Sequence, residues 1–304
     1  MPERPVPGAP PFTFCTSSVL YGAQSLDRAC AEIASLGPRS GSPSGSQTSS
    51  QTSSQTSSPL GSPLAAAGPP PAPPAARCTA LDLWHVPGWC EHLAGGVGGV
   101  AATLGRHGLR LEAISAFGAG AEALDQLLTA LIALGGHALV TGSPPAEVPV
   151  ATFARQIRPL VERATDAGVC LAIENHGRAT IDSTDSMVEL ATLLPAPGLG
   201  LALAPIHLWM RGEETAVALE RLRGRIGLMY LWDWGPTAVA DWKDPREQFL
   251  GTGRIDYAPI ASALRAVGYD RPLCLFAHGP EHWPPQRTTA ELGAALSRAA
   301  ALFG

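Results

Sequence analysis

Residues 169–177, which read VCLAIENHG, decide how the rest of the chain is interpreted. A mostly apolar run leads into Glu174, Asn175 and His176, so the sequence predicts a buried strand that ends in polar and ionisable side chains. Alternate residues of a strand share a face, and Glu174 and His176 therefore point to the same side as Ala172. This pattern indicates a site at the end of a strand.

The length and the charge of the chain exclude several classes of protein. The chain has 304 residues and a net charge of -5; about 260 residues lie outside a low-complexity segment, enough for one large α/β domain. No basic patch predicts binding to nucleic acid, and no apolar run is long enough to span a membrane. The amino-terminal residues lack a signal-peptide pattern, so we expect a cytoplasmic protein without nucleic-acid or membrane partners. The sequence carries no indication of an oligomeric state.

Residues 38–77 differ abruptly in composition from their surroundings. They contain three consecutive QTSS repeats and a Pro/Ala-rich run, and such a segment buries too little apolar surface to offset its ordering entropy. Strand and helix patterns resume after it, so we expect a disordered insertion within a single domain that extends over residues 12–304.

Strand and helix patterns alternate through the rest of the chain. Strands are predicted at residues 12–15, 78–85, 109–117, 137–141, 169–176, 198–204, 226–232 and 272–278. Helices are predicted at residues 25–36, with Ser25 as the N-cap, and at 89–107, 121–134, 150–167, 186–194, 215–225, 257–267 and 289–303. Eight such pairs in this length predict a (β/α)8 TIM barrel, with a doubly wound open sheet as the alternative.

A barrel of this kind carries its chemistry at the carboxyl ends of its strands. The candidate residues there are Asp82, His85, Glu174, His176, His207, Asp233 and His278. Several tryptophans, including Trp209, lie just beyond strand ends and are suited to packing on sugar rings.

Four segments together resemble the xylose isomerase-like TIM barrels, which include sugar phosphate isomerases and epimerases and the AP endonuclease IV group. The segments are IENHG at 173–177, PIHL at 205–208, LWD at 231–233 and GTGRIDYAPIASALRAVGYDRPLCLFAHG at 251–279. The last segment is the most specific. The resemblance implies a TIM barrel that acts on a sugar-like molecule with the help of a divalent cation.

The resemblance also implies a set of metal ligands, of which this chain keeps two. The family's glutamate and second histidine correspond to Glu174 and His207, but Ala204, Tyr230 and Phe276 occupy the other three ligand positions. A methyl group and a phenyl ring cannot bind a hard cation, which requires several anionic oxygens. The sequence therefore predicts a degenerate metal site and leaves enzymatic activity uncertain, because epimerisation needs an acid and a base on opposite faces of the carbon.

Three hypotheses follow from these residues. The first is a carbohydrate-like ligand at the mouth of the barrel, with Glu174 and His207 as catalytic or metal-binding residues. Its substrate-binding residues would be His85, His176, Trp209, Asp233 and His278. The second is an active isomerase or hydrolase whose rebuilt Glu/His site holds zinc, manganese or magnesium, although the sequence establishes no cofactor. The third is a non-catalytic scaffold that uses the insertion for contacts.

Overall fold

The structure is a computed structural model, which describes residues 12–36, 77–236 and 240–304. Nearly all of the predicted insertion at 38–77 lies outside these residues. The barrel strands are β1 (Phe14–Ser17), β2 (Cys78–Val86), β4 (Arg110–Ser115), β5 (Ala138–Thr141), β6 (Cys170–Glu174), β7 (Leu199–Leu203), β8 (Ile226–Leu231) and β9 (Leu273–Leu275). A further short strand, β3 (Cys90–Glu91), pairs antiparallel with the end of β2.

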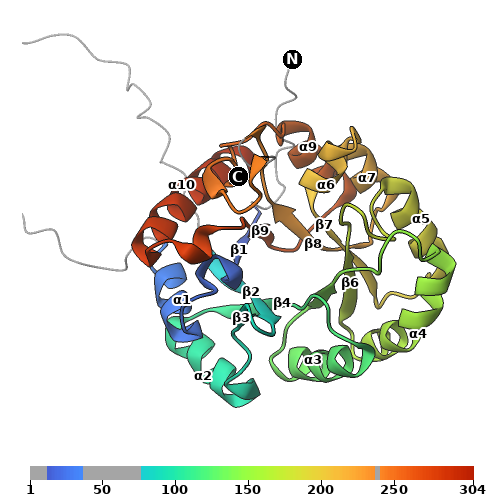
Figure 1. Cartoon of the computed structure of the whole chain (residues 1–304), viewed down its shortest axis with the longest axis horizontal. Helices are drawn as coiled ribbons and strands as arrows, with labels where there is room; N and C mark the ends of the chain where they lie inside the picture. Colours follow the sequence, from blue (N-terminus) through green and yellow to red (C-terminus); the bar gives the residue numbers. More distant parts are fainter. Residues whose placement is uncertain (1–11, 37–76, 237–239) are drawn as a thin grey trace, which may run out of the picture.

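The barrel strands are parallel and form a closed sheet. They follow one another in chain order around the sheet, and β1 pairs with both β2 and β9. Closure confirms the predicted TIM barrel and excludes the doubly wound open sheet. Figure 1 shows the helices as an outer ring around the strands, with α10 beside α1 where the chain closes the circle.

The helices confirm the alternation, with shifted boundaries. They are α1 (Leu26–Ala34), α2 (Gly96–His107), α3 (Ala121–Ala133), α4 (Val150–Asp166), α5 (Thr184–Leu193), α6 (Pro205–Met210), α7 (Thr215–Arg221), α9 (Ala258–Val267) and α10 (Pro285–Phe303). Short 3-10 helices occur at η1 (Ser18–Tyr21), η2 (Pro245–Glu247) and η3 (Pro280–His282). Ser25 caps α1 as predicted, because its side chain accepts a hydrogen bond from the backbone N–H of Arg28.

The predicted helix at 89–107 is shorter than expected. Its first residues form β3 and a turn, and helix α2 starts only at Gly96. Four glycines between residues 95 and 99 lower the helix propensity of this segment. The β2–β3 hairpin therefore takes its place and carries Trp89 over the carboxyl end of the barrel, against His278.

The barrel interior is closed by small residues below the site. Gly200 on β7 and Gly227 on β8 face Cys170, and a Cβ added at Gly200 would lie 2.9 Å from the Cys170 sulfur. Close packing at this level leaves the larger and polar side chains at the carboxyl ends of the strands. Within the described ranges, no helix has both the length and the apolar character that a membrane span requires.

Candidate functional site

Glu174 ends strand β6 and faces the barrel mouth. It pairs in register with Ala202 of β7 and is only 5% exposed. Its carboxyl group has no hydrogen bond to any residue in the described part of the chain. Burial, followed by the charge of Asp82, raises the pKa of Glu174 to about 8. The side chain is therefore mainly a neutral carboxylic acid at neutral pH.

Asp82 on β2 is a second carboxyl group at the mouth, and it is fully hydrogen-bonded. Its Oδ1 accepts a hydrogen bond of 2.6 Å from Ser115 Oγ, and its Oδ2 accepts one of 2.9 Å from Trp84 Nε1. The Ser115 hydroxyl also lies 3.2 Å from the Tyr230 hydroxyl. Burial raises the pKa of Asp82 to about 6, and the hydrogen bonds oppose this rise. Asp82 is thus mainly ionised at neutral pH and is linked to Tyr230 through Ser115.

The three residues at the family's other ligand positions also lie at the mouth. Tyr230 and Phe276 are buried and pack with ring centroids 5.1 Å apart. Ala204 is buried as well, and its backbone N–H and carbonyl are both bound by the Asn175 side chain. These positions form an aromatic and methyl-lined floor in which the tyrosine hydroxyl is the single side-chain polar group.

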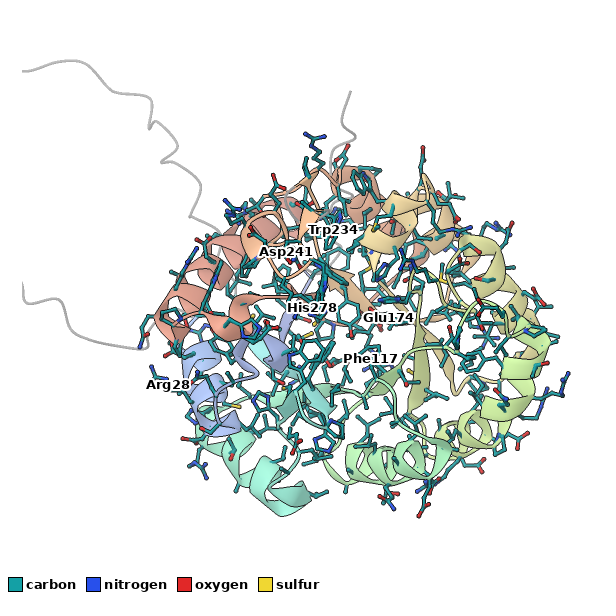
Figure 2. The ribbon with its side chains drawn as sticks, in the orientation of Figure 1. Arg28, Phe117, Glu174, Trp234, Asp241 and His278 are labelled. Atoms are coloured by element: carbon teal, nitrogen blue, oxygen red, sulfur yellow. The ribbon has the colours of Figure 1, made fainter. Side chains whose placement is uncertain are left out.

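His278, after strand β9, is enclosed by aromatic side chains. The ring centroids of its neighbours lie 4.8–5.9 Å from the imidazole, and these neighbours are Trp84, Trp89, Trp232, Trp242 and Phe276. Its Nδ1 atom is buried and has no hydrogen-bond partner. Burial, followed by His176, lowers the pKa of His278 to about 3, so the ring is neutral. Figure 2 shows His278 and Glu174 near the centre of the ring of strands.

His207 and His176 form a second group of imidazoles at the mouth. Their ring centroids are 4.3 Å apart, and His207 also contacts the edge of Trp232 at 5.5 Å. His207 is buried, and its Nε2 atom has no partner. Burial, followed by His176 and His278, lowers the pKa of His207 to about 3. His176 is exposed, and its Nδ1 lies 2.9 Å from the carbonyl oxygen of Gly177.

Asp233, which the sequence predicts to contact the substrate, is instead surrounded by backbone N–H groups. It is 1% exposed, and both of its oxygens accept backbone hydrogen bonds. The donors and distances are Trp234 N at 2.8 Å, Gly251 N at 2.9 Å, Gly253 N at 2.9 Å and Ile255 N at 3.1 Å. Both oxygens of Asp233 thus hold the 251–255 turn.

Two other predicted residues lie at the edge of the site. Trp209 on α6 is 37% exposed. His85 on β2 has a buried Nδ1 atom without a partner, and its charge acts on His92. No electrostatic contact between His85 and Glu174 is present in the described residues. The structure therefore groups His176, His207 and His278 with one another, places Glu174 within the electrostatic reach of Asp82, and sets His85 beside His92.

Gln248 was not identified from the sequence, yet it connects the parts of the mouth. Its Oε1 accepts hydrogen bonds of 2.9 Å from Trp232 Nε1 and from the backbone N–H of His278. Its Nε2 donates to the carbonyl oxygens of Trp242 at 2.6 Å and Asp244 at 3.0 Å. A glutamine between η2 and the 251–255 turn has no local sequence signal, because its partners are distant in sequence or belong to the backbone.

The side chains present do not fit the divalent cation that the family pattern implies. Across residues 12–36, 77–236 and 240–304, no three His, Cys, Asp or Glu side chains are grouped so as to hold a metal ion. Ala204 and Phe276 supply no ligand atom, and burial raises the pKa of the Tyr230 phenol well above its usual range. A neutral phenol is a poor ligand for such an ion.

The closed parallel barrel defines a TIM-barrel protein, and the polar groups at the carboxyl ends of its strands form the candidate site. Residues 102–299 match the model of the xylose isomerase-like TIM barrel family, and the chain belongs to this family. Probable endonuclease 4 of Mycobacterium ulcerans is 30% identical over 125 residues, which are 40% of this chain and 48% of that protein. Probable endonuclease 4 of Mycobacterium marinum matches to the same extent. The chain thus spans about half the length of these curated relatives.

Solved structures of low sequence identity share the fold. The IOLI protein with a binding zinc atom has a TM-score of 0.67 and 13% identity, with 96% of this chain and 99% of that chain covered. D-psicose 3-epimerase with D-tagatose from Clostridium cellulolyticum H10 has a TM-score of 0.67 and 11% identity, with the same coverage. L-ribulose 3-epimerase has a TM-score of 0.63 and 17% identity, with 94% and 95% covered.

Proposed function

We propose that the mouth of the barrel binds a small polyhydroxylated, carbohydrate-like molecule through protein side chains alone, without a divalent metal ion. The observation that carries this proposal is a set of buried polar groups without partners. They are His207 Nε2 and His278 Nδ1. The Glu174 side chain, which is 5% exposed, also forms no hydrogen bond within the described residues. A buried polar atom left without a hydrogen bond costs about 1–3 kcal/mol. A ligand that supplies hydroxyl groups would recover this cost.

The chemistry of these groups favours hydroxyls. A hydroxyl donates and accepts hydrogen bonds, so it can serve neutral imidazoles and a neutral carboxylic acid alike. Trp89 and Trp242 are 37% and 48% exposed, and their ring centroids lie 5.5 and 5.3 Å from that of His278, so they offer apolar surface for the C–H faces of a sugar ring. The solved relatives that are named as epimerases of L-ribulose and D-psicose support a carbohydrate-like ligand.

The proposal assigns binding and does not assign metal-dependent isomerisation. Moving a proton between the two faces of a carbon needs an acid and a base on opposite sides. Phe276 stands at the position of one of the two carboxylates that would supply them, and Glu174 is the one carboxyl group at the family positions. A rebuilt metal site would need His85, His176 and His278 around Glu174. However, His278 is enclosed by aromatic rings, and His85 lies close enough to His92 to lower the pKa of that imidazole. The scaffold hypothesis concerns residues outside the described part of the chain.

The test is a titration of tryptophan fluorescence with neutral monosaccharides and polyols in the presence of a chelator. Trp84, Trp89 and Trp232 surround the site and should report binding. His207→Ala should weaken binding roughly tenfold, because one hydrogen bond is worth about 1 kcal/mol or slightly more. His107→Ala is the matched control, since His107 lies on α2 and pairs with Asp27. Absence of binding by the whole panel refutes the proposal, as does one equivalent of metal that is lost in Glu174→Gln.

A further inference from the structure

A cavity lies beside the mouth, between the η1–α1 loop, the β2–β3 hairpin and the first turns of α2. Its volume is about 650 Å³, within the range of about 300–1,000 Å³ that is typical of small-molecule sites. Figure 1 shows β3 on the inner side of α1 and α2, which pack against each other. The Glu174 carboxyl group and the imidazoles of the mouth do not line this cavity, so it is a separate space.

Trp89 forms the wall between the cavity and the mouth. It lines the cavity, its ring stacks on His278 with the centroids 5.5 Å apart, and it packs edge-on against Trp84. The hairpin turn that carries it is fixed, because the Gly88 N–H donates a hydrogen bond of 2.6 Å to Glu91 Oε1 and Gly88 adopts a left-handed conformation with a φ of +77°. A ligand that packs on Trp89 at the mouth can therefore extend past this indole into the cavity.

His92 ties the loop wall of the cavity to the hairpin wall. Its imidazole is 6% exposed, with Nδ1 2.9 Å from Ser18 Oγ and Nε2 3.1 Å from the carbonyl oxygen of Gln24. Both ring nitrogens are engaged, so His92 supports the cavity and is not a ligand contact. Walls that are fixed before binding lower the entropic cost of ordering a site.

The α2 wall leaves room for a ring. Gly95 and Gly99 line the cavity, and a Cβ atom added at either position would meet no other atom within 4 Å. Longer side chains here would project into this open space, although they would raise the helix propensity of α2. The space in front of α2 is thus open to a bound molecule.

The polar side chains around the cavity suit neutral hydroxyl groups. Among the described residues, the Gln24 side chain forms no hydrogen bond, and Ser25 Oγ accepts one from the backbone N–H of Arg28 and keeps its own proton to donate. The lining contains the Glu91 carboxylate and no lysine or arginine. A neutral sugar ring therefore fits this cavity better than a phosphorylated one, whose charge would lie near Glu91 without a counter-ion.

We propose that the ligand of this protein is a neutral disaccharide, with one ring at the mouth and the second ring in the cavity. This inference rests on the proposed function and extends it from one ring to two. Trp89 contacts both rings, and Gln24 and Ser25 bind hydroxyl groups of the second. Gly95 and Gly99 leave the space that the second ring occupies.

The experiment compares monosaccharides and disaccharides by isothermal titration calorimetry in the presence of a chelator. The probes are D-glucose and D-galactose, and maltose, cellobiose and lactose. At least one disaccharide should bind about tenfold more tightly than either monosaccharide, because the second ring adds hydrogen bonds and apolar contact. If the monosaccharides bind and no disaccharide binds more tightly, the inference is overturned and the proposed function stands. Absence of binding by every probe counts against both.

A variant pair locates the second ring. Gly99→Leu places a side chain in the space beside α2, and the disaccharide should then lose its advantage over the monosaccharides. Gly105→Leu is the matched control, because Gly105 lies on the same helix with equally open space but does not line the cavity. It should keep the disaccharide preference. Leucine favours a helix more than glycine does, so both variants should fold. A disaccharide preference that persists in Gly99→Leu, or that is lost equally in both variants, would show that the second ring does not occupy the cavity.

Discussion

Asp233→Asn separates the two roles that this residue can have. A ligand contact would leave the folded state intact when it is replaced, whereas a loop anchor would not. The structure shows Oδ1 accepting from the backbone N–H groups of Trp234 and Ile255, and Oδ2 accepting from Gly251 and Gly253. Asparagine keeps one oxygen, but its amide group places N–H donors against one of these two pairs of N–H donors.

The magnitude follows from the bonds that are lost. Hydrogen bonds to a charged group contribute roughly 1.5–3 kcal/mol each, and an unsatisfied buried donor costs about 1–3 kcal/mol. Two of the four bonds disappear, and two donors lose their acceptor. If the amide group of the asparagine faces Gly251 and Gly253, the two donors that lose their acceptor are only partly buried. We therefore expect Asp233→Asn to lower the free energy of unfolding by about 3–5 kcal/mol. This is a large part of the ~5–15 kcal/mol that stabilises a typical protein.

The measurement is urea denaturation followed by circular dichroism, with the slope compared between variants. The midpoint should fall by roughly 1–2 M. Asp166→Asn is the control, because Asp166 is exposed at the end of α4 and should change stability by less than about 0.5 kcal/mol. A loss below about 1 kcal/mol in Asp233→Asn, together with weaker ligand binding, would show that Asp233 is a ligand contact after all.

Gln248→Leu should lower the free energy of unfolding by about 2–4 kcal/mol, because Trp232 Nε1 and the His278 backbone N–H lose their shared acceptor; unchanged urea midpoints and tryptophan emission, with exposed Gln126→Leu as control, would contradict this. Burial raises the pKa of Glu174 to about 8, against an ordinary value of 4.5. Its contribution to the free energy of unfolding is therefore fully present below pH 4.5, and on the order of a few kcal/mol is lost as the pH rises to 8. Relative to the unmodified chain, Glu174→Gln should therefore gain stability between pH 5 and 9. If the free energy of unfolding of the two chains changes with pH in the same way, Glu174 is not a buried neutral carboxyl group. Gly198→Ala should lose about 1–3 kcal/mol, because its Cβ would lie 2.3 Å from the Val161 carbonyl oxygen; Gly105→Ala, in open space on α2, should instead gain about 0.5–1 kcal/mol in the same thermal denaturation assay.

The barrel was predictable because its signals are local. Apolar runs such as the one at residues 169–173 indicate burial, and capping residues indicate where helices end. Both are recognised without reference to the rest of the chain. The region around β3 was less predictable, since its glycines suit both a weak helix and a hairpin. Only pairing with the end of β2 separates the two.

The candidate site was predictable in part. The ends of strands β6 and β9 placed Glu174, His176 and His278 at one mouth, and a family pattern added His207; their roles in binding stay predictions. The surroundings of these residues were not predictable, because they depend on segments far apart in the chain. Gln248 and Ser115 have no motif, and Asp233 resembles a ligand contact until the 251–255 turn is seen to enclose it.

The sequence by itself determined the barrel and the position of its mouth, and the family resemblance predicted that Ala204, Tyr230 and Phe276 occupy three metal-ligand positions. The barrel and its mouth follow from residue type and from strand period, which are properties of neighbouring residues. Only the tertiary structure decided the state of the side chains at the mouth. Burial makes Glu174 and the imidazoles of His207 and His278 neutral, and hydrogen bonds occupy Asp82 and Asp233, because desolvation and partner geometry arise only when distant strands and loops meet.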